Sequence, residues 1–128
     1  MNVLLDTCTF LWLVTDRREL SKRAREVFRS PENRLFLSAA SAWEIALKNA
    51  AGRLWLADPP GTFVPRERER HAIDVLPIDE ADALGAGSLP GWHRDPFDRL
   101  LVCQALARGM PILTPDPLIS RYPVKTIW

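Results

Sequence analysis

The sequence predicts an α/β fold in which helices cover both faces of a mostly parallel sheet of four to five strands. Short apolar runs alternate with helical segments along all 128 residues, and this alternation is typical of right-handed crossovers between parallel strands. The length suits one domain, and the chain shows no internal repeat or low-complexity tract. We therefore expect a single domain over residues 1–128.

The N-terminal part predicts one strand and two helices. Residues 2–6 form a short apolar run that ends in an acid, as expected for a buried parallel strand. Residues 9–14 continue as a short apolar helix. Over 20–29 the apolar side chains fall on one face, and Ser21 is placed to begin that helix.

The middle part predicts a second strand over 34–38 and a helix over 39–52 that ends at Gly52. Two prolines in "DPPG" at 58–61 indicate a loop. The charged run "PRERERH" at 65–71 is typical of a solvated helix face rather than of a specific binding site.

The C-terminal part begins with a third strand over 72–78 and a short helix over 79–87, followed by a turn in "LPGW". The clearest helix covers 95–109, with proline in its first turn and glycine at its end. A fourth strand is expected over 111–114, and a closing edge strand over 124–128 after a turn with a short helix.

The composition is that of a globular protein, with 47% hydrophobic and 26% charged residues. No apolar run is long enough to cross a bilayer, and the N-terminus lacks the features of a secretory signal. Cys8 and Cys103 have no ligand-like spacing to each other or to His71 and His93. We expect reduced thiols in a cytoplasmic protein that makes no membrane contact.

Five acidic residues follow strands, or begin the helices that leave them. In a parallel sheet, ligands bind beyond the carboxyl ends of the strands, where the strand order reverses. These acids are therefore expected to share one cleft: Asp6, Glu44, Asp95, Asp98 and Asp116.

Each acid also has a local structural interpretation. Asp6 and Asp95 can cap helices, and Asp116 before a proline can begin a turn. Ser41 and Glu44 match a capping box, and Glu44 can also pair with Lys48. These roles are independent of one another, so they do not explain why all five acids fall at the same edge of the sheet.

Clustered carboxylates repel one another in a cleft unless a cation neutralises them. Mg²⁺ prefers such oxygens, and it acidifies bound water for phosphodiester hydrolysis. If five of the 16 acids surround a metal, the remaining 11 face 17 basic residues, a balance suited to a polyanion such as RNA. Fourteen of these bases are arginines, although a genome rich in G and C would produce the same excess.

Four segments occur in an order that resembles the PIN-domain ribonucleases, and within them the VapC toxins of type II toxin–antitoxin systems. The segments are "LLDTCTFLW", "LSAASAWEIALKNAAGRLWL", "LPGWHRDPFDRLLVCQA" and "ILTPDPLISRYPV". The resemblance implies a three-layer α/β/α sandwich and RNA cleavage with Mg²⁺, for which Mn²⁺ is able to substitute.

The resemblance also implies roles for particular residues. Asp6, Glu44, Asp98 and Asp116 would be the catalytic metal ligands, with Asp95 binding directly or through water. Thr7, Ser41 and Thr114 would support the acids or a metal-bound water. Arg99 would meet a phosphate or form a structural ion pair, and His93 would be either a phosphate contact or, more simply, a surface loop residue.

The partners implied by the resemblance are an RNA substrate and a cognate VapB-like antitoxin. The family also implies a homodimer, which can enter a larger toxin–antitoxin assembly. The antitoxin segment that covers the active site would meet Leu11, Trp12 and the 53–66 region, although the aromatic side chains there are also candidates for the core.

Two other functions remain open from the sequence. A PIN-like binding module without metal would lack one of the acids, and none is missing. A phosphohydrolase with an aspartate nucleophile also begins with an apolar strand that ends in Asp, but it needs a second acid two residues later. Cys8 stands at that position here.

Overall fold

The computed structural model describes residues 1–128 and has a five-stranded sheet with the order β3-β2-β1-β4-β5. All four neighbouring strand pairs are parallel. The strands are β1 (Asn2–Leu5), β2 (Arg34–Ser38), β3 (Ile73–Leu76), β4 (Ile112–Leu113) and β5 (Thr126–Ile127). The predicted parallel sheet is thus confirmed with five strands, and the strand order reverses between β1 and β4.

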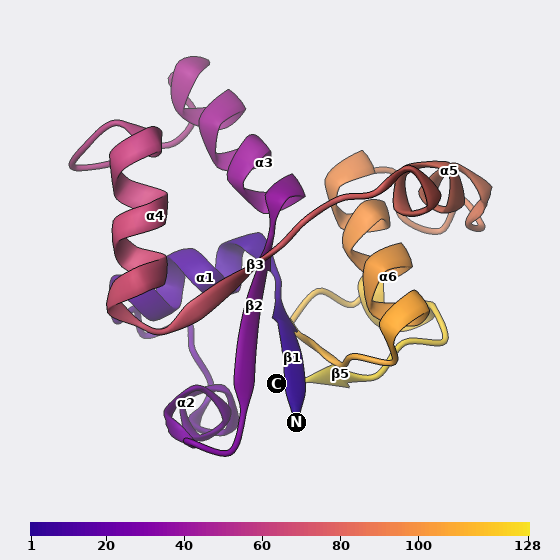
Figure 1. Ribbon diagram of the computed structural model, residues 1–128, viewed down its shortest axis with the longest axis horizontal. Helices are drawn as coiled ribbons and strands as arrows, with labels where there is room; N and C mark the ends of the chain where they lie inside the picture. The colour runs from indigo at the N-terminus through magenta and orange to yellow at the C-terminus, as the bar shows by residue number, and fades with distance from the viewer.

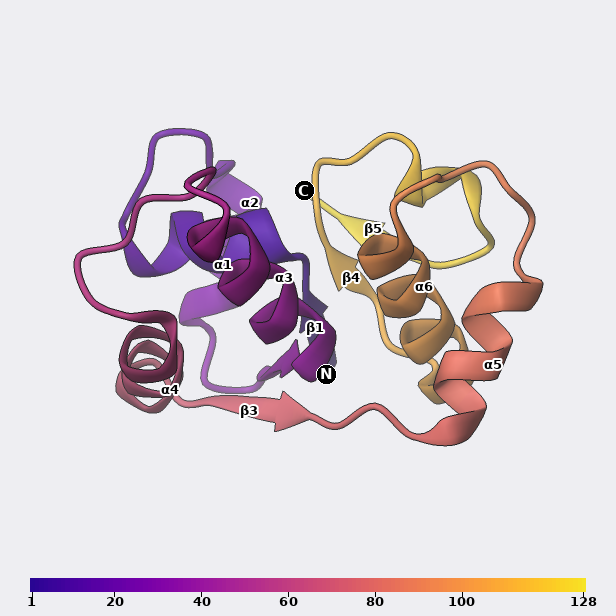
Figure 2. The same ribbon diagram turned by 90° about the horizontal axis from the view of Figure 1, so that it is seen from above.

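Six α-helices connect the strands. They are α1 (Thr7–Val14), α2 (Lys22–Arg29), α3 (Ala39–Ala50), α4 (Pro60–Arg70), α5 (Glu80–Ser88) and α6 (Pro96–Arg108), and a 3₁₀ turn η1 (Ile119–Arg121) precedes β5. Figures 1 and 2 show α1, α2 and α4 on one side of the strands and α5 with α6 on the other. The arrangement is the three-layer α/β/α sandwich that the sequence predicted.

Alternation along β1 divides the interior into two cores. Val3 and Leu5 face the core formed with α1, α2 and α4, whereas Leu4 faces the core formed with α6 and η1. All three side chains are fully buried, as expected for the central strand of a sheet covered on both faces. Packing on both faces therefore fixes where β1 ends, and Asp6 follows at that end.

Helix α3 takes a different position, because it leaves the carboxyl end of β2 and touches helices of both layers. It contacts α1 and α4 on one side and α6 on the other, and Figure 1 shows it beyond the end of the sheet. The inward face of α3 therefore looks over the carboxyl ends of the strands.

Helix ends agree with several local predictions. Ser21 accepts a hydrogen bond from the Ala24 backbone N–H and begins α2. Gly109 ends α6 in the left-handed conformation, with φ of 64°, and Gly52 follows α3 with φ of 70°. Asp79 and Asp82 form a capping box at the start of α5, which was not predicted.

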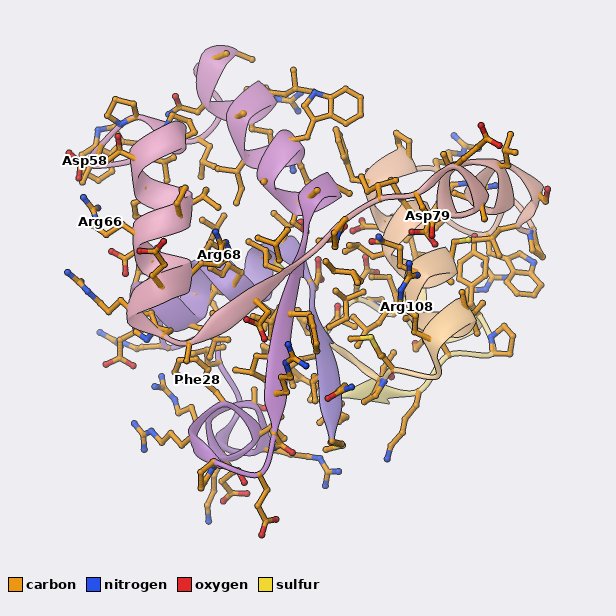
Figure 3. All side chains as sticks on the ribbon, in the orientation of Figure 1. Phe28, Asp58, Arg66, Arg68, Asp79 and Arg108 are labelled. Carbon is orange, nitrogen blue, oxygen red and sulfur yellow. The ribbon has the colours of Figure 1, made fainter.

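Two predictions for the region between β2 and β3 were wrong. The segment 58–61 is not all loop, because Pro60 occupies the first turn of α4, where its missing N–H has no partner to lose. The charged run 65–71 is not simply a solvated face, since the Glu67 side chain is buried there. Glu67 is the one buried residue of the run, whereas Arg66 points outward in Figure 3.

A buried polar network joins α5 to α6. Arg108 donates to both carboxylate oxygens of Asp82 at 2.9 Å, and Figure 3 shows Arg108 on α6 with Asp79 of the α5 cap nearby. Gln104 donates to Asp82 and accepts a hydrogen bond from Ser38 at the end of β2. The network thereby connects α6, which carries two of the candidate acids, to the sheet.

No helix in the structure combines the length and the apolar character that a bilayer crossing requires.

Candidate metal centre

A cleft of about 540 Å³ opens at the carboxyl end of the sheet. It lies beyond β1 and β4, at the point where the strand order reverses, which is where ligands bind in open parallel sheets. All five acids singled out in the sequence line this one cleft: Asp6, Glu44, Asp95, Asp98 and Asp116.

Asp6 is buried at the end of β1, with only 5% of its surface exposed. Thr114 donates to its Oδ2 at 2.6 Å, and the Cys8 thiol donates to the same oxygen at 3.4 Å. Asp6 is the N-cap residue of α1, and its backbone carbonyl accepts the first helical hydrogen bond, but its carboxylate makes no capping bond. Burial raises the pKa of Asp6, and the bond from Thr114 opposes that rise.

Glu44 projects from α3 and is buried as well. Its Oε2 accepts from Lys48, so the predicted pair is confirmed. Its Oε1 is buried without a hydrogen-bond partner. The capping box was wrong, because Ser38 caps α3 and Ser41 lies one turn inside the helix. A buried carboxylate oxygen without a donor is costly unless a cation or water reaches it.

Asp95 and Asp98 stand at the start of α6 and differ in what they do. Asp95 caps the helix, since its Oδ1 accepts from the Phe97 backbone N–H at 2.8 Å, as one interpretation predicted. Asp98 lies one turn further and faces the cleft. Burial, together with the nearby carboxylates of Asp6, Asp95, Glu44 and Asp116, raises the pKa of Asp98 to about 8.

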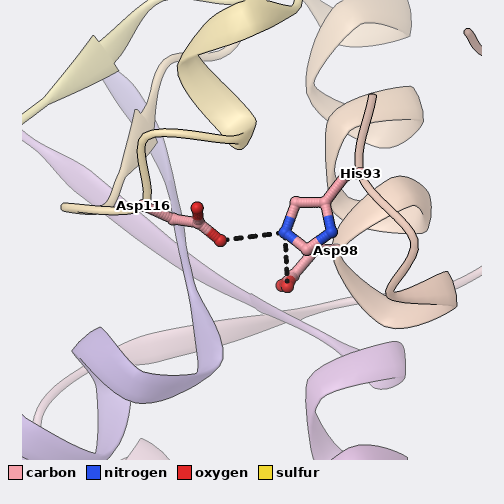
Figure 4. Close-up of side chains that lie close together, drawn as sticks. All are labelled: His93, Asp98 and Asp116. Atoms are coloured by element: carbon pink, nitrogen blue, oxygen red, sulfur yellow. Dashed lines mark hydrogen bonds and ion pairs between the residues drawn. The ribbon is translucent and has the colours of Figure 1, made fainter. Parts of the chain in front are cut away.

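Asp116 follows β4 and begins a turn, as expected, with its Oδ1 accepting from the Leu118 backbone N–H at 2.8 Å. Its Oδ2 lies 2.9 Å from Nε2 of His93, and Oδ2 of Asp98 lies 3.1 Å from the same nitrogen. Figure 4 shows the imidazole reaching both carboxylates.

The expectation that His93 is a surface loop residue was wrong. The residue is 7% exposed, because the loop before α6 folds inward. The spacing of "HRDPFDR" carries no signal for this contact, since it depends on the tertiary path of the loop.

The supporting residues divide into two groups. Thr114 bonds the acids as predicted, accepting the Asp116 backbone N–H at 3.0 Å while donating to Asp6. Thr7 instead donates to Ser41 at 2.8 Å, which joins α1 to α3 behind the cleft. Arg99 forms no ion pair with an acid; its guanidinium donates to four backbone carbonyls of residues 86–93 and holds that segment.

The donor set fits a hard divalent cation. Carboxylate oxygens predominate, as Mg²⁺ and Mn²⁺ prefer, and Glu44 Oε1 lacks a partner. The ligand-type atoms of His93, Asp98 and Asp116 lie within 4.8 Å of one another. A cation between these groups would offset the repulsion that raises the pKa of Asp98.

An α/β sandwich with an acidic cleft where its strand order reverses defines a class of candidate metal-dependent hydrolases. The sequence profile of the PIN domain matches residues 3–125. The chain therefore belongs to the PIN domain family.

A comparison with curated proteins gives one relative. Ribonuclease VapC16 of Mycobacterium tuberculosis is 37% identical over 57 residues. The aligned part is 44% of this chain and spans only 40% of that relative's length.

Solved structures share the fold at low sequence identity. VapBC2 of Rickettsia felis, bound to a DNA fragment from its promoter, has a TM-score of 0.72 at 12% identity and covers 100% of this chain and 99% of that one. A toxin–antitoxin complex from Klebsiella pneumoniae has a TM-score of 0.65 at 15% identity, with coverage of 98% and 96%. VapBC-1 of nontypeable Haemophilus influenzae has a TM-score of 0.62 at 19% identity, and the match covers 99% of this chain and 97% of that one.

Proposed function

We propose that this PIN-domain protein is a metal-dependent endoribonuclease that acts as the toxin of a VapBC-type toxin–antitoxin pair. The observation that carries the proposal is the convergence of five acids from separate parts of the chain on one cleft. Family membership and the printed name of the mycobacterial relative support ribonuclease activity.

Asp6, Glu44, Asp98 and Asp116 would hold Mg²⁺ or Mn²⁺, and Asp95, whose Oδ1 caps α6, would bind directly through its other oxygen or through water. When bound, the cation supplies a water of lowered pKa and stabilises charge on the phosphate. The chain contributes orientation. Thr114 fixes Asp6 relative to Asp116, and the Thr7–Ser41 bond holds α1 against α3.

The rim of the cleft supports a polyanionic substrate. Arg53 is exposed at the rim, and Lys48 lies beside Glu44 within the same lining. Arginine binds phosphate in a fixed fork, so Arg53 would contact the RNA backbone while the acids hold the cation for the scissile phosphate. The proposal places the protein in the cytoplasm together with its RNA.

A second hollow next to the cleft supports an antitoxin partner. It measures about 300 Å³, is lined by Leu11, Trp12, Leu54 and Trp55, and shares Leu11 and Leu54 with the acidic cleft. Trp12 packs against Trp128, with ring centroids 5.9 Å apart. Trp55, by contrast, is 84% exposed. An antitoxin segment over this hollow would cover Trp55 and reach the acids.

The assembly is part of the same proposal. A solved structure with this fold is a toxin–antitoxin complex, which supports association with an antitoxin, and the homodimer is proposed from the family resemblance. Light scattering of the protein with and without its antitoxin measures both associations.

The test of the activity is RNA cleavage with and without Mn²⁺, followed on denaturing gels. The parent should cleave only with the cation, and Asp98→Asn should reduce the rate by at least 100-fold while circular dichroism stays unchanged. Asp58→Asn is a matched control, because Asp58 pairs with Arg66 outside the cleft (Figure 3). Cleavage by Asp98→Asn at the parental rate would refute the assignment.

The same experiment separates the two alternatives. A metal-free binding module would leave the RNA intact both with and without Mn²⁺. A phosphohydrolase with Asp6 as nucleophile needs an acid at position 8, but Cys8 is there and its thiol donates to Asp6. Burial and the Asp6 charge raise the pKa of the Cys8 thiol, so it does not replace a carboxylic acid in that role.

A further inference from the structure

His93 bridges the two sides of the acidic cleft. Its Nε2 lies 2.9 Å from Asp116, which follows β4, and 3.1 Å from Asp98, which lies on α6 (Figure 4). The three polar atoms are close enough together for one cation. The imidazole is therefore either a nitrogen ligand for the metal or a hydrogen-bond donor to the two acids.

The other ring nitrogen decides between these roles. The backbone N–H of Asp95 lies 3.1 Å from Nδ1 of His93, and a backbone N–H can only donate. Nδ1 therefore accepts, and the neutral ring carries its hydrogen on Nε2. A histidine nitrogen must present a lone pair in order to bind a metal, and Nε2 with its hydrogen presents none. This hydrogen points at the two carboxylates instead.

The loop that carries His93 is held in place independently of the acidic side chains. Tyr122 accepts a hydrogen bond from the His93 backbone N–H at 2.9 Å and donates to the Pro90 carbonyl at 2.6 Å. Arg99 donates to the carbonyls of both Pro90 and His93. Side chains from two other segments thus hold the loop, and the imidazole enters the cleft from a fixed position.

We propose that His93 is a positioning residue that clamps Asp98 and Asp116 for cation binding and is not itself a ligand. This inference rests on the proposed metal-dependent function of the cleft. One neutral donor shared by two acids holds them together without adding a positive charge that would compete with the cation. Asp116 is then held at both oxygens, by His93 and by the Leu118 N–H, whereas Asp98 keeps Oδ1 for the cation.

The first experiment is Mn²⁺ calorimetry on the parent, His93→Ala and His93→Gln. Loss of a residue that orients metal ligands typically weakens metal affinity about 10- to 100-fold, and we expect His93→Ala to fall in that range. Glutamine can place an amide N–H near the position of Nε2, so His93→Gln should recover most of the affinity. His71→Gln is the matched control, since His71 lies beside Glu67 and Phe28 on α4 and α2.

The second experiment measures directly which nitrogen of the His93 ring carries the hydrogen. The chain has two histidines, so ¹⁵N-histidine NMR of His71→Gln reports on His93 alone, with and without Mg²⁺. We expect hydrogen on Nε2 in both conditions. Loss of that hydrogen when Mg²⁺ is added would make His93 a ligand and overturn the proposal.

The calorimetry has two further contrary outcomes. Equal Mn²⁺ affinity for the parent and His93→Ala would show that His93 has no role in positioning the acids. If His93→Gln bound Mn²⁺ as weakly as His93→Ala, hydrogen-bond donation would be excluded as the cause of the loss in affinity. A parent that binds no Mn²⁺ would overturn the proposed function itself, and the NMR tautomer would still report the hydrogen bonds of the ring. If His93→Ala does not fold, His93→Gln and the NMR experiment still decide.

Discussion

Thr114 connects Asp6 and Asp116 through a single hydroxyl group. It donates to Oδ2 of Asp6 at 2.6 Å, across 108 residues of sequence, and accepts the backbone N–H of Asp116 at 3.0 Å. The carboxyl ends of β1 and β4 are therefore joined by a side chain as well as by the sheet. These two hydrogen bonds set the distance between Asp6 and Asp116, which no local sequence pattern relates.

Thr114→Val should weaken both the fold and the cation site. Valine has nearly the same shape but leaves the buried Asp6 without its shortest hydrogen bond, which costs about 1–3 kcal/mol in unfolding free energy. The pKa of Asp6 should rise further, since the bond from Thr114 opposes the effect of burial. Urea unfolding measures the loss of stability, and Mn²⁺ titration measures the loss of cation affinity. A variant with the parental unfolding free energy and the parental Mn²⁺ affinity would contradict this role of Thr114. Thr62→Val, at an exposed position of α4, is the control.

Asp98→Asn should make the metal-free protein more stable at pH 8. The pKa of Asp98 is about 8 in the folded protein and about 3.9 in an unfolded chain. An acid with a raised folded pKa lowers stability as pH increases from about 4 to 8, because the unfolded chain loses its proton first. Asparagine removes that penalty. Thermal unfolding in chelator at pH 5 and pH 8 measures it, and an equal effect at both pH values would contradict the prediction.

Cation binding should release protons below pH 8. Asp98 must lose its proton to bind a cation, so Mn²⁺ affinity should increase with pH up to about 8. Calorimetry at pH 6.5 in two buffers with different ionisation enthalpies measures the release. Identical heats in the two buffers would show that Asp98 is already ionised or takes no part.

Asp82→Asn should destabilise the fold without changing any residue that lines the acidic cleft. Asp82 is 3% exposed and accepts two bonds from Arg108, and breaking such a pair costs about 2–4 kcal/mol. Arg108 lowers the pKa of Asp82, so the stabilisation is present above its ordinary pKa and is lost as pH falls through the folded value. Urea unfolding at pH 7 and pH 3 should show a large difference from the parent at pH 7 and a smaller one at pH 3. Glu80→Gln, exposed on the same helix, is the control.

Trp55→Ala should weaken antitoxin binding and leave stability unchanged. The side chain is 84% exposed, so its removal opens no cavity, whereas aromatic side chains at an interface often contribute about 2 kcal/mol or more to binding. Calorimetry with the cognate antitoxin measures the loss. Leu84→Ala is the control, since Leu84 is exposed on α5, away from this hollow. Equal affinity of Trp55→Ala and the parent would place the antitoxin elsewhere.

The parallel sheet and the shared cleft could be predicted because both follow from local patterns, whereas the strand order was not predicted. Apolar runs predicted the parallel sheet, and Asp6 and Asp116 were assigned to its carboxyl edge from their positions after β1 and β4. The caps were only partly predictable. Asp95 caps α6 as its sequence suggests, but Ser38, not Ser41, caps α3, because β2 continues directly into the helix.

His93 and Arg99 could not be predicted, because their contacts depend on how residues 86–95 fold back on α6. The imidazole reaches Asp116 across 23 residues, and Arg99 binds carbonyls rather than an acid. Exposure was also unpredictable around Trp55. The aromatic residues there resemble core residues by composition, yet Trp12 packs against Trp128 whereas Trp55 faces solvent.

The most direct measurement of the central claim is anomalous diffraction from crystals soaked in Mn²⁺. We predict a manganese peak in contact with carboxylate oxygens of Asp6, Asp98 and Asp116, with His93 Nε2 facing the acids and not the ion. A crystal that holds manganese only outside the cleft, while the same preparation cleaves RNA, would contradict the account.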